Sequence, residues 1–452
     1  MPIRSLLLAL GLCLALPAPA AVRHDLDDPA LAATVNGETL SSAFVDVMHR
    51  IALRGDASVT RAAVVQALVD DRLVAAHARA HYPHEALIED NKVAFSPAVQ
   101  IRQNMVSNLQ AAFRDKLEAR LKRLPGGTLN ALIVAERAPT AAEWNAVLGK
   151  PAGMVLEYAL SDAGRAAAAK VILLRYRYDK RDGQVSLLDV YDSQNVQGRN
   201  LLHARTAGFA RDEARQLLKQ RWILDWARSP EGLGEADFAV FHRSIEDHLV
   251  HGGWMAWLGV APDIHDDPQP IKDLQAQVTD AEVRTYYEAH RDQFQRIEKV
   301  RARHLRVRDE ATANAALERL HKGEAFADVA RAVSLEADAA SGGDMGWIVH
   351  SERPASWLES LAFVQKPGVP SRPVRLPGPE GSEPGWEILL VEERVMGYHP
   401  VDSDSVRYMA SQAIAKQKAL DQYRDTVERL RREADIRLHP GLSPLARPKE
   451  GS

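Results

Sequence analysis

The sequence predicts an α+β protein, in which a mainly helical module with a large insert is joined to a smaller domain of mixed strands and helices. Near both ends of the chain, apolar residues recur at helical spacing: Val64, Leu68 and Leu73 in the N-terminal part, and Val406, Met409 and Ala413 in the C-terminal part. Over residues 297–396, short β-like runs alternate with helical runs and glycine turns. That alternation within so short a stretch is typical of a single small domain.

The first residues predict export. Arg4 precedes an apolar run from Leu6 to Leu16 and the small residues of 18–20, so we assign residues 1–21 to a cleavable signal peptide and expect a periplasmic protein. The run is about half the ~20 residues of a membrane span, and no later stretch replaces it, so we expect no stable membrane insertion. Cys13, the only cysteine, follows Leu12 and not the small residue of a lipid-anchoring signal. The mature chain would have no thiol for disulfides, metal sites or nucleophilic catalysis.

Charge and length exclude other classes of protein. The formal net charge of −4 is spread along 452 residues without a basic stripe, so neither nucleic acid nor an anionic membrane is an expected partner. The length suggests about three domains. The oligomeric state is left open.

Residues 22–90 predict the first part of the helical module. A short strand and turn at 34–40 carries Asn36-Gly37, a pair that favours positive φ. Helical patterns follow at 43–51 and 61–80.

Residues 91–275 predict an insert of no recognised family. It begins with one long helix at 99–124, and the runs 171–178 and 184–191 flank Asp182-Gly183 as in a β-hairpin. Because its apolar content is high, we expect a folded extension of the module and not a disordered linker. A polar segment interrupted by prolines, 263–270, marks its end.

The C-terminal part predicts a linker helix at 276–296, the small domain at 297–396 and a long helix at 397–440. Thr279 and Glu282 have the spacing of a capping box for the linker helix. The apolar stripe on 406–434 requires a partner, and we expect it to pack on the N-terminal helices.

Ordered motifs in the small domain point to one family. They are 301–307 (RARHLRV), 323–330 (GEAFADVA), 341–347 (SGGDMGW), 361–368 (LAFVQKPG) and 385–388 (GWEI). Together they resemble the parvulin-type (PpiC, rotamase) peptidyl-prolyl cis/trans isomerases, which implies a small four-stranded antiparallel sheet with surrounding helices. The flanking segments at 30–85 and 276–440 resemble SurA, PpiD and PrsA, extracytoplasmic folding factors in which a helical chaperone module accompanies parvulin domains.

The resemblance implies the site residues. Met345 and Trp357 match the apolar socket for the proline ring, Phe363 belongs to the same substrate-binding region, and His304 matches the first of two histidines at the floor of the site. Taken without the family, Met345 and Trp357 are also consistent with plain core packing, and His304 with a buried, hydrogen-bonded histidine.

Three positions depart from the family pattern. Glu336 stands where parvulins carry Cys or Asp, and Glu387 stands where the second histidine belongs. Arg353 and Pro354 replace an apolar segment that closes the socket. The change at Glu336 is mild, because an acidic side chain is kept, and the resemblance makes His304, Glu336 and Glu387 the expected catalytic residues. Because a buried charge is costly unless it is paired, the other two changes predict reduced isomerase activity.

The resemblance implies a catalyst that needs no metal or cofactor and binds unfolded or extended proline-containing polypeptides. Amide resonance sets a barrier of ~18–20 kcal/mol, and the catalyst must favour the twisted amide. His77, His81 and His84 could form a metal site, but their Ala- and Arg-rich helix favours a solvated face. We do not favour a metal at Asp247, His248 and His251 either.

Three functions remain open at this point. The first is an active isomerase with chaperone activity, and the second is a chaperone whose parvulin domain only binds peptide. The third is an assembly protein for one envelope or secreted partner. Measured turnover separates the first two, and a single tight client would identify the third.

Overall fold

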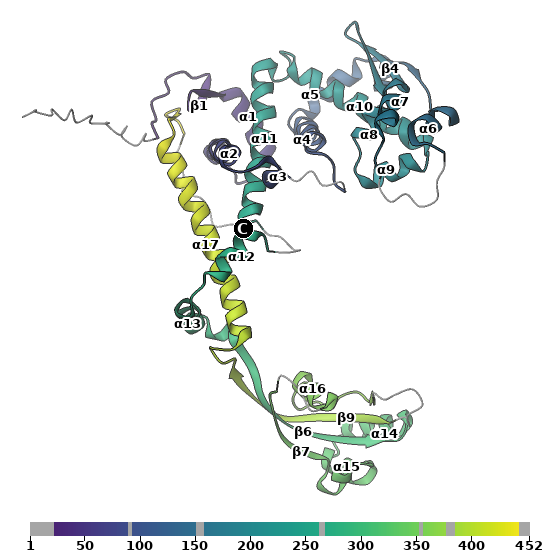
Figure 1. The fold of residues 1–452 in the computed structure, drawn as a ribbon, viewed down its shortest axis with the longest axis vertical. Coiled ribbons are helices and arrows are strands. Elements are labelled where there is room, and N and C mark those ends of the chain that lie inside the picture. The colour runs from purple at the N-terminus through teal and green to yellow at the C-terminus, as the bar shows by residue number, and fades with distance from the viewer. Residues whose placement is uncertain are drawn as a thin grey trace, which may run out of the picture. The chain divides into compact units, whose positions relative to one another are not determined.

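The computed structural model describes residues 22–88, 93–150, 158–261, 267–351, 356–376 and 385–442 (Figure 1). The chain divides into two compact units, residues 1–271 with 418–452 and residues 272–417. The predicted signal peptide and Arg353 with Pro354 lie outside the described residues. None of the helices in the described ranges is long and apolar enough to cross a membrane.

The first unit is mainly helical. Its strands are β1 (Leu31–Val35), β2 (Glu38–Ser41), β3 (Ile133–Glu136), β4 (Ile172–Tyr178), β5 (Arg181–Ser186) and β10 (Ile436–Leu438). Its helices are α1 (Ser42–Ala52), α2 (Arg61–His81), α3 (His84–Leu87), α4 (Pro97–Ala112), α5 (Arg114–Lys122), α6 (Ala141–Leu148), α7 (Asp162–Lys170), α8 (Leu187–Asp192), α9 (Val196–His203), α10 (Ala207–Arg228) and α11 (Gly234–Leu258).

The two ends of the chain meet in one small sheet. β1 and β2 form the expected hairpin, whose turn residues Asn36 and Gly37 have φ values of 49° and 83°. β10 pairs with β1 on the other side, giving the order β10-β1-β2. The sequence did not predict β10, because a strand of three residues carries almost no pattern.

A hydrophobic core holds α1, α2, α4, α10 and α11 together, with Phe44, Leu109 and Phe241 fully buried. The expected single helix at 99–124 is wrong. Phe113, at φ −125° and ψ 27°, separates α4 from α5 and packs edge-on against Trp226. Burial of this ring is compatible with the break in the helix.

The insert has a core of its own, built on the sheet β3-β4-β5 and helices α6–α10. The predicted hairpin is present, but its turn is at Asp179 and Lys180, which have positive φ, and not at Asp182-Gly183. Gly183 instead faces the Tyr176 ring. The expected strand also ends early, because Ser186 caps α8 through a capping box with Asp189.

The apolar stripe of the C-terminal helix α17 (Asp404–Glu433) is divided between the two units. In the first unit, Tyr423 and Val427 pack with Val74 and Trp254. In the second, Val406 and Ala410 pack with residues of the linker helix. The expectation that the whole stripe packs on the N-terminal helices is therefore wrong for its first half, because α13 provides a nearer apolar face.

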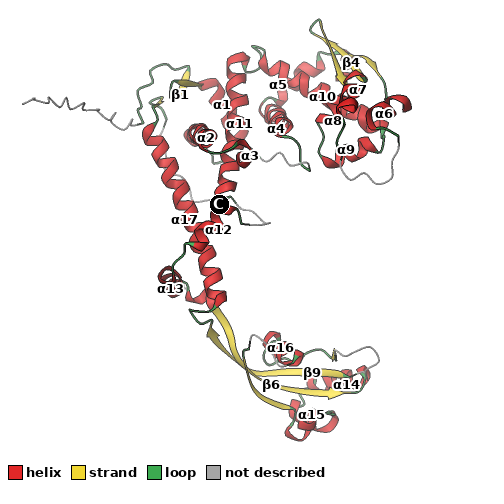
Figure 2. Ribbon diagram, in the orientation of Figure 1, coloured by secondary structure: helices red, strands yellow, loops and turns green. Residues whose placement is uncertain are grey.

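The second unit contains the four-stranded antiparallel sheet β7-β6-β9-β8 (Figure 2). Its strands are β6 (Gln295–Val307), β7 (Asp344–Val349), β8 (Val374–Arg375) and β9 (Trp386–Tyr398). Its helices are α13 (Asp280–Ala289), α14 (Glu310–His321), α15 (Phe326–Val333) and α16 (Trp357–Val364), while α12 (Gln269–Ala276) leads into the unit. The capping box of Thr279 and Glu282 is formed at the start of α13, which confirms that prediction.

Different helices cover the two faces of this sheet. Leu305, Val307 and Ile388 pack with α14 and α15 on one face. Val300, Leu389 and Val391 pack with α16 on the other. The fold class predicted from the sequence is confirmed.

Candidate functional site

His304 lies on the face of the sheet that α16 covers. It is directly opposite Leu389 in the register of β6 and β9, and opposite residues of an antiparallel pair share a face. Glu387 lies two residues before Leu389 on β9 and so points to the same side. Strand geometry thus brings the imidazole and this carboxylate together.

Both ring nitrogens of His304 contact a carboxylate. Nδ1 lies 3.0 Å from Oε2 of Glu387, and Nε2 lies 2.9 Å from Oδ2 of Asp338. The side chain of His304 is 12% exposed and that of Glu387 is 4% exposed. An ionised carboxylate only accepts hydrogen bonds, so both imidazole nitrogens must donate, which requires the imidazolium form.

The pKa directions agree with this arrangement. Burial alone would lower the pKa of His304, but the hydrogen bonds and negative charges of Glu387 and Asp338 outweigh it, and the pKa is raised. Burial raises the pKa of Glu387, against the opposing effect of the His304 hydrogen bond. We assign the shared proton to the imidazole, because His304 has two acidic partners and Glu387 has one basic partner.

Glu336 does not contact His304. Its Oε1 accepts a hydrogen bond of 2.8 Å from Nη1 of Arg306, and both side chains are partly exposed. The acidic partner that the sequence reasoning missed is Asp338, two residues later in the 3₁₀ turn Ala337–Ser341. Glu336 and Asp338 are two residues apart, and this spacing of two acids was the sequence signal that could have identified Asp338.

The glycine turn at 341–346 is needed for this geometry. Gly343 accepts the backbone hydrogen bond of His304 at 2.9 Å, and it has φ 67°. A Cβ atom there would lie 1.8 Å from the carbonyl oxygen of His304. Only glycine permits both the positive φ and this close approach.

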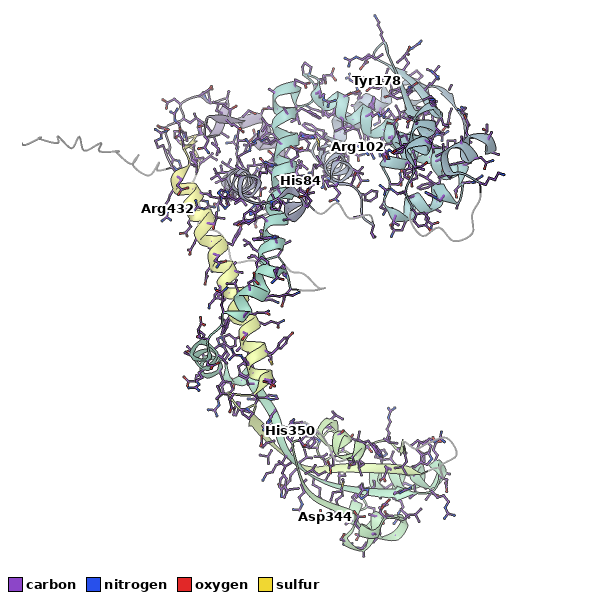
Figure 3. All side chains as sticks on the ribbon, in the orientation of Figure 1. His84, Arg102, Tyr178, Asp344, His350 and Arg432 are labelled. Carbon is purple, nitrogen blue, oxygen red and sulfur yellow. The ribbon has the colours of Figure 1, made fainter. Side chains whose placement is uncertain are left out.

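Met345, Trp357 and Phe363 pack against one hydrophobic cluster on the α16 face of the sheet. Leu389, the residue opposite His304, belongs to the same cluster. Phe363 also lines a cavity of about 390 Å³ together with His350, which is labelled in Figure 3. The two rings meet edge-on with their centroids 5.8 Å apart. The predicted apolar residues and the charged group therefore share one face of the domain.

Other histidines make different contacts. The rings of His77 and His81 are tilted by 37° to each other, with their centroids 4.2 Å apart. Asp247 and His251, by contrast, are buried in ion pairs and hydrogen bonds. Across the described ranges, no group of three or more His, Cys, Asp or Glu residues could hold a metal ion.

This geometry agrees with the family comparison. Residues 278–407 match the family described as the PPIC-type PPIASE domain. The chain thus contains a parvulin-type domain, and this match extends beyond the predicted 297–396 at both ends.

Relatives with this domain are foldases and chaperones. The chain is 29% identical over 161 residues to the foldase protein PrsA of Bacillus subtilis, covering 35% of this chain and 49% of that protein. It is 30% identical over 156 residues to the chaperone SurA of Aromatoleum aromaticum, covering 32% and 34%. It is 36% identical over 155 residues to the periplasmic chaperone PpiD of Haemophilus influenzae, covering 26% and 24%. The matched regions span half or less of these relatives.

Among solved structures, PrsA of Bacillus subtilis is 23% identical, with 58% of this chain and 92% of that chain covered and a TM-score of 0.19.

Proposed function

We propose that this protein is an exported folding factor that binds extended, proline-containing segments of secreted or envelope proteins and isomerises their prolyl bonds slowly. The match of residues 278–407 to the PPIC-type PPIASE domain carries the proposal. The signal-like residues 1–21 and the similarity to a foldase, a chaperone and a periplasmic chaperone support export and client binding.

The chemistry is rotation about the amide that precedes proline. Uncatalysed rotation takes tens to hundreds of seconds, because the planar amide is stabilised by resonance. A protein accelerates it by binding the twisted amide better than either planar form. Met345 and Trp357 would hold the proline ring. His304, Glu387 and Asp338 would set the electrostatic field at the amide.

Slow turnover follows from the partners of His304. Both N–H groups of the imidazolium are engaged by Glu387 and Asp338, so neither is free to donate to the substrate. With all three groups ionised, the cluster has one positive and two negative charges. A field of net negative charge differs from that of the neutral histidine pair expected in the family.

The same contacts favour a second candidate, a chaperone whose parvulin domain binds peptide with little or no turnover. If the His304 cluster is only structural, Trp357 and Met345 would still provide an apolar surface for proline-containing chains. The two candidates share binding and differ in catalysis.

A protease-coupled isomerisation assay on the mature protein separates them, with suppression of client aggregation measured in parallel. We expect measurable turnover below that of an ordinary parvulin and suppression of aggregation for several unrelated clients. Suppression without turnover would support the second candidate. Absence of both, with one tightly bound client, would identify an assembly protein and contradict the proposal.

A further inference from the structure

A pocket of about 530 Å³ lies in the first unit where α4, α5 and α10 meet (Figure 1). This α5 pocket is lined by residues from two segments, 107–129 and 219–223, and by Arg54, which follows the end of α1. The structure describes both segments without a gap. The volume is within the range of about 300–1,000 Å³ that is typical of pockets for small ligands.

The floor of the α5 pocket is apolar. Leu117, Trp222 and Ile223 belong to the main hydrophobic core of the first unit, and Leu121 and Leu129 pack against that core. Four of these five side chains are aliphatic. Such a floor favours a ligand with an alkyl chain, because binding removes the apolar surface of both partners from water.

The exposed rim of the α5 pocket is mainly cationic. Arg54, Arg114 and Lys219 line it, and Glu118 is the one acidic residue among the described lining residues. In the described part of the chain, none of these three cations forms an ion pair with a protein carboxylate. The rim is thus positively charged, although the whole chain has a formal net charge of −4.

The other cations of α10 show that the lack of a partner for Lys219 is local. Each of them forms an ion pair with an acidic residue, and they are Arg211, Arg215, Arg221 and Arg228. Within this fully described helix, the cation that lines the α5 pocket is therefore the one left available. An anionic ligand could pair with it without displacing a protein carboxylate.

We propose that the α5 pocket binds a single-chain anionic amphiphile, an alkyl chain with one carboxylate such as a fatty acid. The chain covers the apolar floor, and the carboxylate pairs with the rim cations. Glu118 disfavours a polyanion, because a second negative charge on the ligand would be repelled by its carboxylate. The site lies in the first unit and does not depend on isomerase activity of the small domain.

The first measurement is titration calorimetry of the full mature protein with decanoate. Decyltrimethylammonium, which has the same chain and the opposite charge, should bind much more weakly. Shorter carboxylates should lose affinity by about fourfold for each CH₂ removed, because each CH₂ contributes to the buried apolar surface. High salt should weaken decanoate binding, since it screens the rim charges.

Charge variants locate the site. Arg114→Gln with Lys219→Gln should weaken decanoate binding about tenfold, because it removes two of the rim cations. Glu118→Gln should strengthen binding, since it removes a like charge. The matched control is Lys122→Gln with Arg123→Gln, the same two changes at exposed positions at the end of α5 outside the pocket. It should leave the affinity unchanged. Because all these positions are exposed, the variants should keep the native melting temperature.

Several results would overturn the proposal. They are native affinity in the Arg114 and Lys219 double variant, an equal loss in the control, and equal affinity for decanoate and decyltrimethylammonium. Competition experiments distinguish other occupants. Displacement of decanoate by an unfolded, proline-free polypeptide would assign the pocket to client binding. Displacement by anionic but not by neutral lipid vesicles would assign its cations to a membrane surface, and either outcome would contradict a site for a free amphiphile.

Discussion

Two histidines with little exposed surface, one in each unit, have similar surroundings and different consequences. His251 of the first unit contacts Asp71 through Nδ1 at 2.6 Å, as His304 contacts Glu387 at 3.0 Å. The two histidines differ in the partner of the other ring nitrogen, Nε2. In His251 it meets the hydroxyl of Tyr423 at 2.9 Å, and in His304 it meets a second carboxylate.

Burial beside a carboxylate therefore does not by itself identify a functional histidine. A phenol can donate or accept, so the His251 contacts are satisfied by either charge state of the ring. Two carboxylates require the charged ring, which concentrates unbalanced charge under the apolar residues of the small domain. The first histidine joins α2, α11 and α17, while we propose that the second sets the electrostatic field of the site.

The largest expected effect comes from removing residues 418–452. This deletion takes away Tyr423, Val427 and the strand β10, all of which are buried in the first unit. We expect the first unit to lose its cooperative unfolding transition in calorimetry, while a chain shortened only after Leu442 keeps it. An unchanged transition in the deletion variant would show that the C-terminal segment does not support this unit.

Trp357→Ala should remove most binding of proline peptides if, as we propose, this ring in the α16-face cluster forms a large apolar wall of the socket. Titration calorimetry with an Ala-Pro-type peptide measures it. Trp347→Ala is the control, since Trp347 is in the same domain but 42% exposed on the edge strand β7. Equal loss in both variants, or no loss in the first, would place the peptide contacts elsewhere.

Arg431→Ala should destabilise the first unit by about 3–5 kcal/mol, because it leaves a buried charge uncompensated. Arg431 Nε contacts Asp70 Oδ1 at 2.6 Å, and the two side chains are 10% and 15% exposed. Arg429→Ala, which removes a more exposed pair with Glu433, should change stability little. Urea denaturation compares them, and equal effects would contradict the distinction between buried and surface pairs.

The smallest effect is a pH dependence of the small domain. The raised pKa of His304 means that the folded state holds its proton more tightly than the unfolded state. Its contribution is complete below the unfolded pKa of ~6.5 and is lost as pH rises through the raised value. The melting temperature of the second unit should fall over this range, and less steeply in Asp338→Asn. A parallel slope in the two proteins would mean that Asp338 does not influence His304.

Sequence motifs predicted the small domain well, because its glycine turn, capping box and strands depend on local residue types. The contact of His304 with Glu387 followed from strand register within the family pattern. Asp338 was missed because the family pattern drew attention to Glu336, and only the 3₁₀ turn decides which of the two acids reaches the ring. The insert and β10 could not be predicted in detail, since their pairing depends on residues distant in the chain.

The effect of the His304 contacts on catalysis is measured by kcat/KM for an Ala-Pro-type peptide in the native protein and in Glu387→His. We expect slow turnover in the native protein, because carboxylates accept from both N–H groups of His304, and faster turnover in the variant, which restores the histidine pair of the family. Native turnover equal to that of an ordinary parvulin, or a variant no faster than the native protein, would contradict it.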